Sequence, residues 1–217
     1  MRLAHMIVLM ATLTAAGIPP ASATPPASGP IRIVVLGDSL SAGFGLSATD
    51  AFPAKLQKAL KAKGIEIDMT NAGVSGDTAS GARDRLDWSV PEGTEGVIVE
   101  LGANDALRGT DPSVTRAALA DIVSRLKARG VAVLLCGMLA PPNYGSEYAG
   151  RFDSIYPDLA KSFGIALYPF FLDGVAADAK LNQADGMHPT PSGVDVIVMR
   201  MMPMVEAFLG SIRGQSR

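Results

Sequence analysis

Residues 31–40 read IRIVVLGDSL, an apolar run that ends abruptly at a glycine and two polar residues. A short run of branched apolar residues bounded in this way is typical of a strand buried on both faces of a parallel sheet. Comparable short runs recur along the chain and are predicted strands: 65–70, 97–101, 131–136 and 165–168.

The segments between these runs carry the spacing of amphipathic helices. In 112–129, apolar residues recur at every fourth position; Asp111 is a suitable N-cap and Gly130 a suitable C-terminal stop. Helices are also expected over 50–63 and from near Pro191 towards the C-terminus. Strands that alternate with helices predict an α/β fold whose parallel sheet is covered by helices on both faces.

The composition is that of one globular domain. The chain has 217 residues, of which 48% are hydrophobic and 18% charged, and its formal net charge is −2 without any basic run. The absence of a basic run argues against nucleic acid and against an anionic membrane surface as partners. We find no internal repeat and no sign of a second domain.

The N-terminus has the pattern of a secretory signal peptide. Arg2 is followed by an apolar stretch over 6–18 and by Ala21-Ser22-Ala23, small residues that suit signal cleavage. The alternative is a membrane anchor, but this stretch is shorter than the roughly 20 residues needed to span a bilayer. We therefore expect export to the bacterial periplasm with no stable membrane anchor. The expected organisation is a signal peptide over 1–23, a spacer over 24–30 and one domain over 31–213.

Cysteine and histidine are scarce in this chain. Cys136 is the single cysteine and lies in an apolar run, so a buried inert thiol is expected there. The two histidines are His5, which leaves with the predicted signal peptide, and His188. Any imidazole chemistry of the mature protein therefore depends on His188.

Polar residues follow three predicted strands and form a fourth group near the C-terminus. The segments are Gly37-Asp38-Ser39-Leu40, Asn71 to Thr78, Gly102-Ala103-Asn104-Asp105 and Asp185-Gly186-Met187-His188-Pro189. Each has an ordinary structural interpretation, as a turn, a helix cap or a surface loop. Their shared position after strands favours a common site, because ligands of such folds bind beyond the carboxyl ends of the strands.

These residue types together support nucleophilic catalysis. A serine hydroxyl such as that of Ser39 is a weak nucleophile that needs an adjacent base, and His188 is the candidate base. Asp185 lies three residues earlier, where its carboxylate is able to orient the imidazole. The candidate oxyanion donors are the backbone N–H groups of Ser39 and Gly76 and the side-chain amide of Asn104.

Ser39, Gly76, Asn104 and His188 match, in order, the four blocks of the SGNH, or GDSL, hydrolases. The stretches VVLGDSLSAGFG, NAGVSGDT, LGANDALRG and DGMHPT are similar to the branch of thioesterase I, lysophospholipase L1 and arylesterases. The Gly-x-Ser-x-Gly pattern of α/β-hydrolases is absent around Ser39.

The resemblance implies a three-layer α/β/α sandwich with a flavodoxin-like sheet, the SGNH hydrolase fold. It implies a serine hydrolase of carboxylic esters and thioesters with a Ser39, His188 and Asp185 triad and an acyl-enzyme. It also implies a backbone role for Gly102 and a structural role for Asp38. No cofactor is implied, and one histidine does not make a usual zinc site.

The substrate is less defined by the sequence. Loop 138–150 is expected to line an acyl groove, with Tyr144 in it and Met187 beside His188 as candidate substrate contacts; a surface loop and a packing methionine are the alternatives. The expected partner is a small-molecule ester or thioester, and no obligate protein partner is evident. Two other functions remain open, a carbohydrate O-deacetylase of the same fold and a non-catalytic ligand-binding module.

Overall fold

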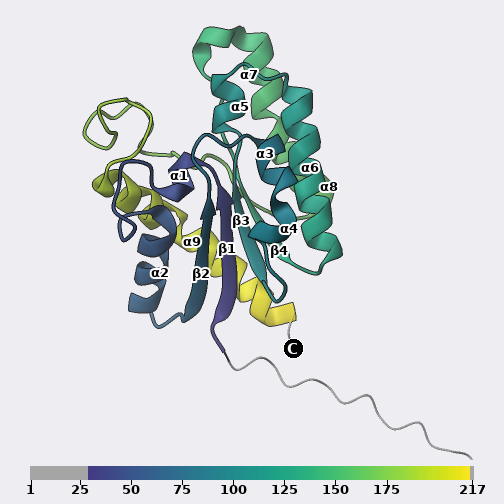
Figure 1. Ribbon diagram of the computed structural model, residues 1–217, viewed down its shortest axis with the longest axis vertical. Coiled ribbons are helices and arrows are strands. Elements are labelled where there is room, and N and C mark those ends of the chain that lie inside the picture. Colours follow the sequence, from purple (N-terminus) through teal and green to yellow (C-terminus); the bar gives the residue numbers. More distant parts are fainter. Residues whose placement is uncertain (1–28, 216–217) are drawn as a thin grey trace, which may run out of the picture.

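The computed structural model describes residues 29–215, so the predicted signal peptide over 1–23 lies outside the described residues. Its centre is a parallel sheet of five strands in the order β2-β1-β3-β4-β5 (Figure 1). The strands are β1 (Ile31–Gly37), β2 (Ile67–Gly73), β3 (Gly96–Glu100), β4 (Ala132–Cys136) and β5 (Ala166–Tyr168). This is the flavodoxin-like order, which confirms the predicted sheet.

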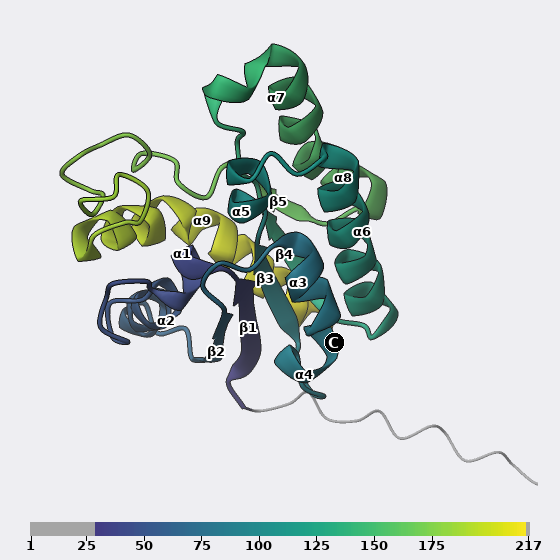
Figure 2. The same ribbon diagram turned by 45° about the horizontal axis from the view of Figure 1, so that its top comes forward.

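Helices cover both faces of the sheet, so the predicted three layers are confirmed. One face is covered by α2 (Phe52–Ala62) and α9 (Pro191–Gln215), which pack against each other. The opposite face is covered by α3 (Ala79–Asp84), α4 (Leu86–Ser89), α6 (Pro112–Ala128) and α8 (Ile155–Phe163) (Figures 1 and 2). At the carboxyl end of the sheet lie α1 (Ser39–Ala42), α5 (Ala103–Leu107), the 3-10 turn Pro142–Tyr144 and α7 (Gly145–Asp153).

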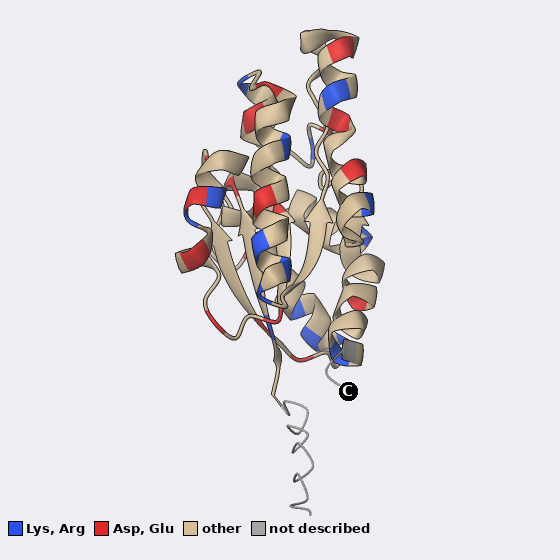
Figure 3. Cartoon of the chain, turned by 90° about the vertical axis from the view of Figure 1, so that its right-hand side faces the viewer, with Lys and Arg blue, Asp and Glu red and all other residues tan. Residues whose placement is uncertain are grey.

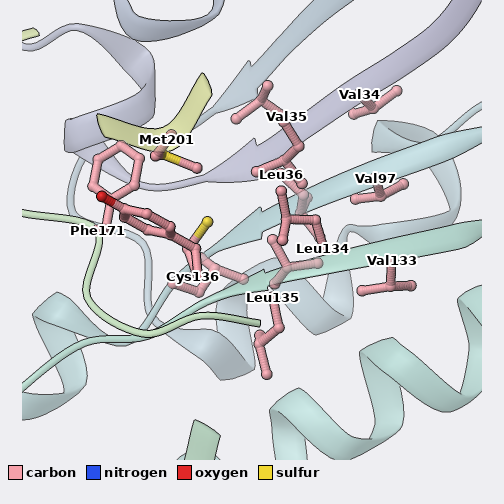
Figure 4. Close-up of a cluster of buried hydrophobic side chains, with 14 of the residues drawn as sticks. Val34, Val35, Leu36, Val97, Val133, Leu134, Leu135, Cys136, Phe171 and Met201 are labelled. Carbon is pink, nitrogen blue, oxygen red and sulfur yellow. The ribbon is translucent and has the colours of Figure 1, made fainter. Parts of the chain in front are cut away.

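The central strands are apolar because both of their faces are buried. Val34, Val97 and Val133 occupy one register row across β1, β3 and β4, and Figure 4 shows them side by side. On the other side of the sheet, Met201 of α9 lies near Phe171, and both side chains are fully buried. Burial of large apolar side chains of this kind contributes about 1.5–3 kcal/mol each.

The predicted strand over 65–70 begins two residues too early and ends three residues too early. β2 is an edge strand, and most of its residues after Ile67 are at least partly exposed. An edge strand therefore continues through polar residues such as Thr70 and Asn71, which apolar periodicity does not identify.

The helix ends follow the predicted signals. Asp111 caps α6 by accepting a hydrogen bond from the Ser113 backbone N–H, and Gly130 adopts a left-handed φ of 72° directly after that helix. In α9, Met201 and Met202 are buried and form part of the core. Met199 is instead 65% exposed, because it lies on the outer side of α9.

The surface carries charges of both signs. On the face shown in Figure 3, Lys and Arg alternate with Asp and Glu along the outer sides of the helices. None of the helices within residues 29–215 is long and apolar enough to cross a membrane.

Candidate active site

The predicted site residues meet at the carboxyl end of the sheet. β1 and β3 are neighbours, but the chain leaves them towards opposite faces, so a crevice opens where the strand order reverses. Ser39 follows β1 and Asn104 follows β3. The segment between β5 and α9, which carries His188, lies beside α1 (Figures 1 and 2).

Ser39 is the first residue of the short helix α1. The Asp38 carboxylate caps this helix by accepting a hydrogen bond from the Leu40 backbone N–H at 3.0 Å. The Ser39 side chain is nearly buried, and its Oγ lies 2.9 Å from His188 Nε2. The predicted nucleophile and the predicted base are therefore within hydrogen-bond distance of each other.

Asp185 completes this chain of contacts. Its Oδ2 lies 2.7 Å from His188 Nδ1, while its Oδ1 accepts hydrogen bonds from the backbone N–H groups of Met187 and His188. These backbone bonds, from His188 first, lower the pKa of Asp185 to about 2. The carboxylate is therefore ionised at neutral pH and orients the imidazole with its N–H on Nδ1.

The loop that carries His188 is tied to the rest of the site. The Gln183 backbone N–H donates to the His188 carbonyl at 2.7 Å, and the Gln183 side-chain amide donates to the Phe44 carbonyl at 2.7 Å. The Phe44 ring lies over the imidazole, with 4.6 Å between ring centroids. These contacts fix His188 relative to the turn that holds Ser39.

Two predicted oxyanion donors have no acceptor. Within residues 29–215, neither the Ser39 nor the Gly76 backbone N–H donates a hydrogen bond to the protein. Gly76 has a φ of 83°, a conformation that strains any residue with a Cβ. Arg108 donates to the Gly76 carbonyl at 2.9 Å and so anchors the peptide group that follows the Gly76 N–H.

The Asn104 amide is already engaged. Its Nδ2 donates to Asp38 Oδ2 at 3.1 Å and to the Asp77 carbonyl at 3.0 Å. An oxyanion contact of this amide therefore requires one of the two bonds to be shared or exchanged. Gly102, with a φ of 110°, turns the chain ahead of Asn104, and a Cβ there would collide with the Tyr156 hydroxyl.

Asp38 is fully buried, and burial raises its pKa to about 6 against the hydrogen bonds from Leu40 and Asn104. Above that pH the carboxylate accepts from both groups and holds Asn104 beside the Ser39 turn. The structural role expected of Asp38 fits these contacts.

Three positioning residues were not identified from the sequence. Arg85 is 7% exposed and forms an ion pair with Asp77 at 2.6 Å. It also donates hydrogen bonds to the carbonyls of Gly37 and Ala72. Arg85 therefore joins the ends of β1 and β2 to the Gly76 loop. Asp105 accepts from the Ala79 backbone N–H and links α5 to α3. Arg108 holds the Gly76 carbonyl. No periodicity marks such residues, because their partners are distant in sequence.

A pocket of about 450 Å³ opens beside Ser39 and His188. Its lining is mainly apolar and includes Leu40, Ala103, Ala106, Leu107, Met138, Leu139, Pro141, Pro142, Phe170, Leu172, Ala176, Ala177 and Met187. A concave apolar site with a few convergent polar groups is typical of a small-molecule site.

The two predicted substrate contacts differ in position. Met187 lines the pocket and is half-exposed. Tyr144 is not a lining residue, because its hydroxyl donates to the Leu107 carbonyl and its ring packs against Gly109 and Tyr148. The loop predicted over 138–150 lines the pocket with its first residues and then becomes the turn Pro142–Tyr144 and α7.

Comparison with known proteins places the chain in a family. Esterase TesA of Pseudomonas aeruginosa is 38% identical over 178 residues, 82% of this chain and 89% of that protein. Thioesterase 1/protease 1/lysophospholipase L1 of Escherichia coli K12 is 38% identical over 80% of this chain and 84% of its own. The crystal structure of AlinE4, an SGNH-hydrolase family esterase, has a TM-score of 0.70 and 43% identity over 82% of this chain and 96% of that one. Residues 35–196 match the model of the GDSL-like lipase/acylhydrolase family, and the chain belongs to that family.

Proposed function

We propose that this protein is a serine hydrolase of carboxylic esters and thioesters. The observation that carries the proposal is the continuous contact from Ser39 Oγ through His188 to Asp185, at the mouth of an apolar pocket. The esterases and thioesterase to which the chain is similar support this reaction class.

The first half-reaction transfers the acyl group to Ser39. The Ser39 hydroxyl attacks the carbonyl carbon while His188 Nε2, 2.9 Å away, takes its proton. The imidazolium that forms is stabilised by Asp185, which stays ionised. His188 then gives the proton to the leaving alcohol or thiol as the bond to the acyl carbon breaks.

The oxyanion formed in this step needs donors that are already oriented. The free backbone N–H groups of Ser39 and Gly76 supply two of them, and the Asn104 amide is the third. In the second half-reaction, water loses its proton to His188 and attacks the acyl-enzyme, and the same donors bind the second oxyanion. The bond between the acyl carbon and Ser39 Oγ then breaks as His188 returns the proton to Oγ. Ser39 and the free acid are the products.

The pocket indicates which part of the substrate binds there. Its walls are mainly apolar, so the acyl or aryl group of a small ester enters it, and Met187 contacts that group at the mouth. Met187 is half-exposed, so its side chain is not part of the buried core and is accessible from the pocket that it lines.

Kinetics with p-nitrophenyl esters of graded acyl length test this function. The wild-type protein is expected to hydrolyse them, and Asn104→Ala is expected to lower kcat by about 10²–10³-fold with little change in KM, since the amide acts on the transition state. Asn143→Ala is a matched control, because Asn143 is exposed on the turn Pro142–Tyr144. Its kinetics should equal those of the wild type.

The outcomes separate the candidate functions. An Asn104→Ala effect confined to KM, in a protein whose thermal unfolding is unchanged, contradicts the oxyanion role. Release of acetate from an acetylated glycan without turnover of any simple ester would favour a carbohydrate O-deacetylase. Absence of turnover on all of these substrates would favour a binding module.

We also propose that the chain is exported and acts in the periplasm. The support is the sequence of residues 1–23, with Arg2, its apolar stretch and the small residues before Thr24. Mass spectrometry of protein recovered from a periplasmic extract is expected to show an N-terminus at Thr24. Recovery of the uncleaved chain from the cytoplasm would contradict this proposal.

A further inference from the structure

Glu100 is a buried acid for which the proposed reaction has no use. It is the last residue of β3, in an otherwise apolar strand, and its side chain is fully buried. Its Cα is in register with Gly37 of β1 and Cys136 of β4, so the carboxyl lies beneath the turn that presents Ser39.

The two carboxyl oxygens of Glu100 differ in their hydrogen bonding. Its Oε2 lies 2.7 Å from the hydroxyl of Ser41 in α1 and 3.4 Å from the Asp38 backbone N–H. Its Oε1 has no hydrogen-bond partner within the described residues. The space for the carboxyl exists because residue 37 is glycine: a Cβ there would lie 2.7 Å from Glu100 Oε2.

A charge on Glu100 would be poorly compensated. No cation pairs with it among residues 29–215. The titratable groups that face it are Asp38 at the end of β1, Cys136 on β4 and Tyr156 on α8. The helices that cover the face of the sheet opposite to α8, which are α2 and α9, present apolar residues to it, such as Leu56 of α2 and Met201 of α9.

The neighbouring carboxyl is better suited to carry the charge. Both oxygens of Asp38 accept a hydrogen bond, from the Leu40 N–H at 3.0 Å and from Asn104 Nδ2 at 3.1 Å, whereas Glu100 Oε1 has no partner among the described residues. Two buried carboxyls at this proximity do not ionise together easily. Burial and the charge of Asp38 both raise the pKa of Glu100 well above its usual value.

We propose that Glu100 is protonated and uncharged, and that in this form it is a positioning residue for the Ser39 turn. The proposal rests on the proposed role of Ser39 as the nucleophile. In this form Glu100 shares a hydrogen bond with Ser41 and fixes α1 on the end of the sheet. The uncharged form adds no negative charge beneath the site where the oxyanion forms. A carboxylate at this position would oppose formation of the oxyanion.

Infrared spectroscopy tests the protonation state without reference to activity. At pH 8, where Asp38 is ionised, the wild-type protein is expected to show the C=O stretch of a protonated carboxyl. Glu100→Gln should lose this band, and Glu92→Gln should keep it, because Glu92 is exposed just ahead of the same strand. A wild-type spectrum without the band would overturn the proposal.

Kinetics test the positioning role. Glu100→Gln, an uncharged isostere, is expected to keep kcat within about threefold, whereas Glu100→Leu loses the bond to Ser41 and should lower kcat about tenfold with KM unchanged. Equal losses of kcat in both variants, or none in Glu100→Leu, would overturn the proposal. If instead Ser39 were not the nucleophile, Ser39→Ala would stay active while the infrared band remained.

Discussion

Ser39→Ala is expected to lower kcat for p-nitrophenyl ester hydrolysis by about 10⁶-fold, the size of effect seen when a triad nucleophile is removed. The reason is that no other hydroxyl in the described residues is in contact with His188 Nε2. Steady-state kinetics with purified protein measure the loss, and circular dichroism checks that the fold is retained.

A second serine provides the control for this variant. Ser146→Ala makes the same chemical change at an exposed position on α7 and should keep wild-type kinetics. Retention of more than about a tenth of wild-type kcat by Ser39→Ala would show that another group is the nucleophile.

Asp185→Asn should lower kcat by about 10⁴-fold with a smaller change in KM. The side-chain oxygen of the introduced asparagine is able to keep the two backbone hydrogen bonds that Oδ1 accepts, so the loop should keep its conformation. The amide NH₂ then faces His188 Nδ1 and favours the tautomer with its proton on Nε2. That tautomer is unable to take the Ser39 proton.

Asp178→Asn is the matched control, because Asp178 is an exposed aspartate of the same loop that accepts from the Lys180 N–H. It should leave kcat near the wild-type value. Near-normal turnover by Asp185→Asn would mean that another acid orients His188.

Much of the fold was predictable because its core obeys simple periodicity. β1 and β3 are buried on both faces and read as apolar runs, and Asp111 and Gly130 mark the ends of α6. The apolar pattern predicts a start and an end of β2 that are both too early, since an edge strand is under weaker apolar constraint. Residues 29–215 do not include the predicted signal peptide, which stays a prediction.

The site residues were predictable where residue type limits the choice. His188 is the one histidine beyond the predicted signal peptide, and Ser39, Gly76 and Asn104 follow three strands whose ends meet. The chemical roles of these residues stay proposals until the variants are measured.

The supporting contacts were not predictable, since they join positions far apart in the chain. The bond between Glu100 and Ser41 spans 59 residues, and the bond between Asn104 and Asp38 spans 66. One feature of the sequence does indicate a special role for Glu100. It interrupts an apolar strand, where burial of an acid costs free energy. The position of Tyr144 outside the pocket depends on its bond to Leu107, which no local pattern specifies.

Covalent trapping of the nucleophile tests the central claim most directly. The protein is treated with a fluorophosphonate, which reacts with activated serine hydroxyls, and is then analysed by intact-mass and peptide mass spectrometry. We predict one adduct per chain, on the peptide that contains Ser39, with labelling lost in Ser39→Ala and strongly slowed in His188→Ala. An adduct on any other residue, or undiminished labelling of Ser39→Ala, would contradict the assignment of Ser39 as the nucleophile.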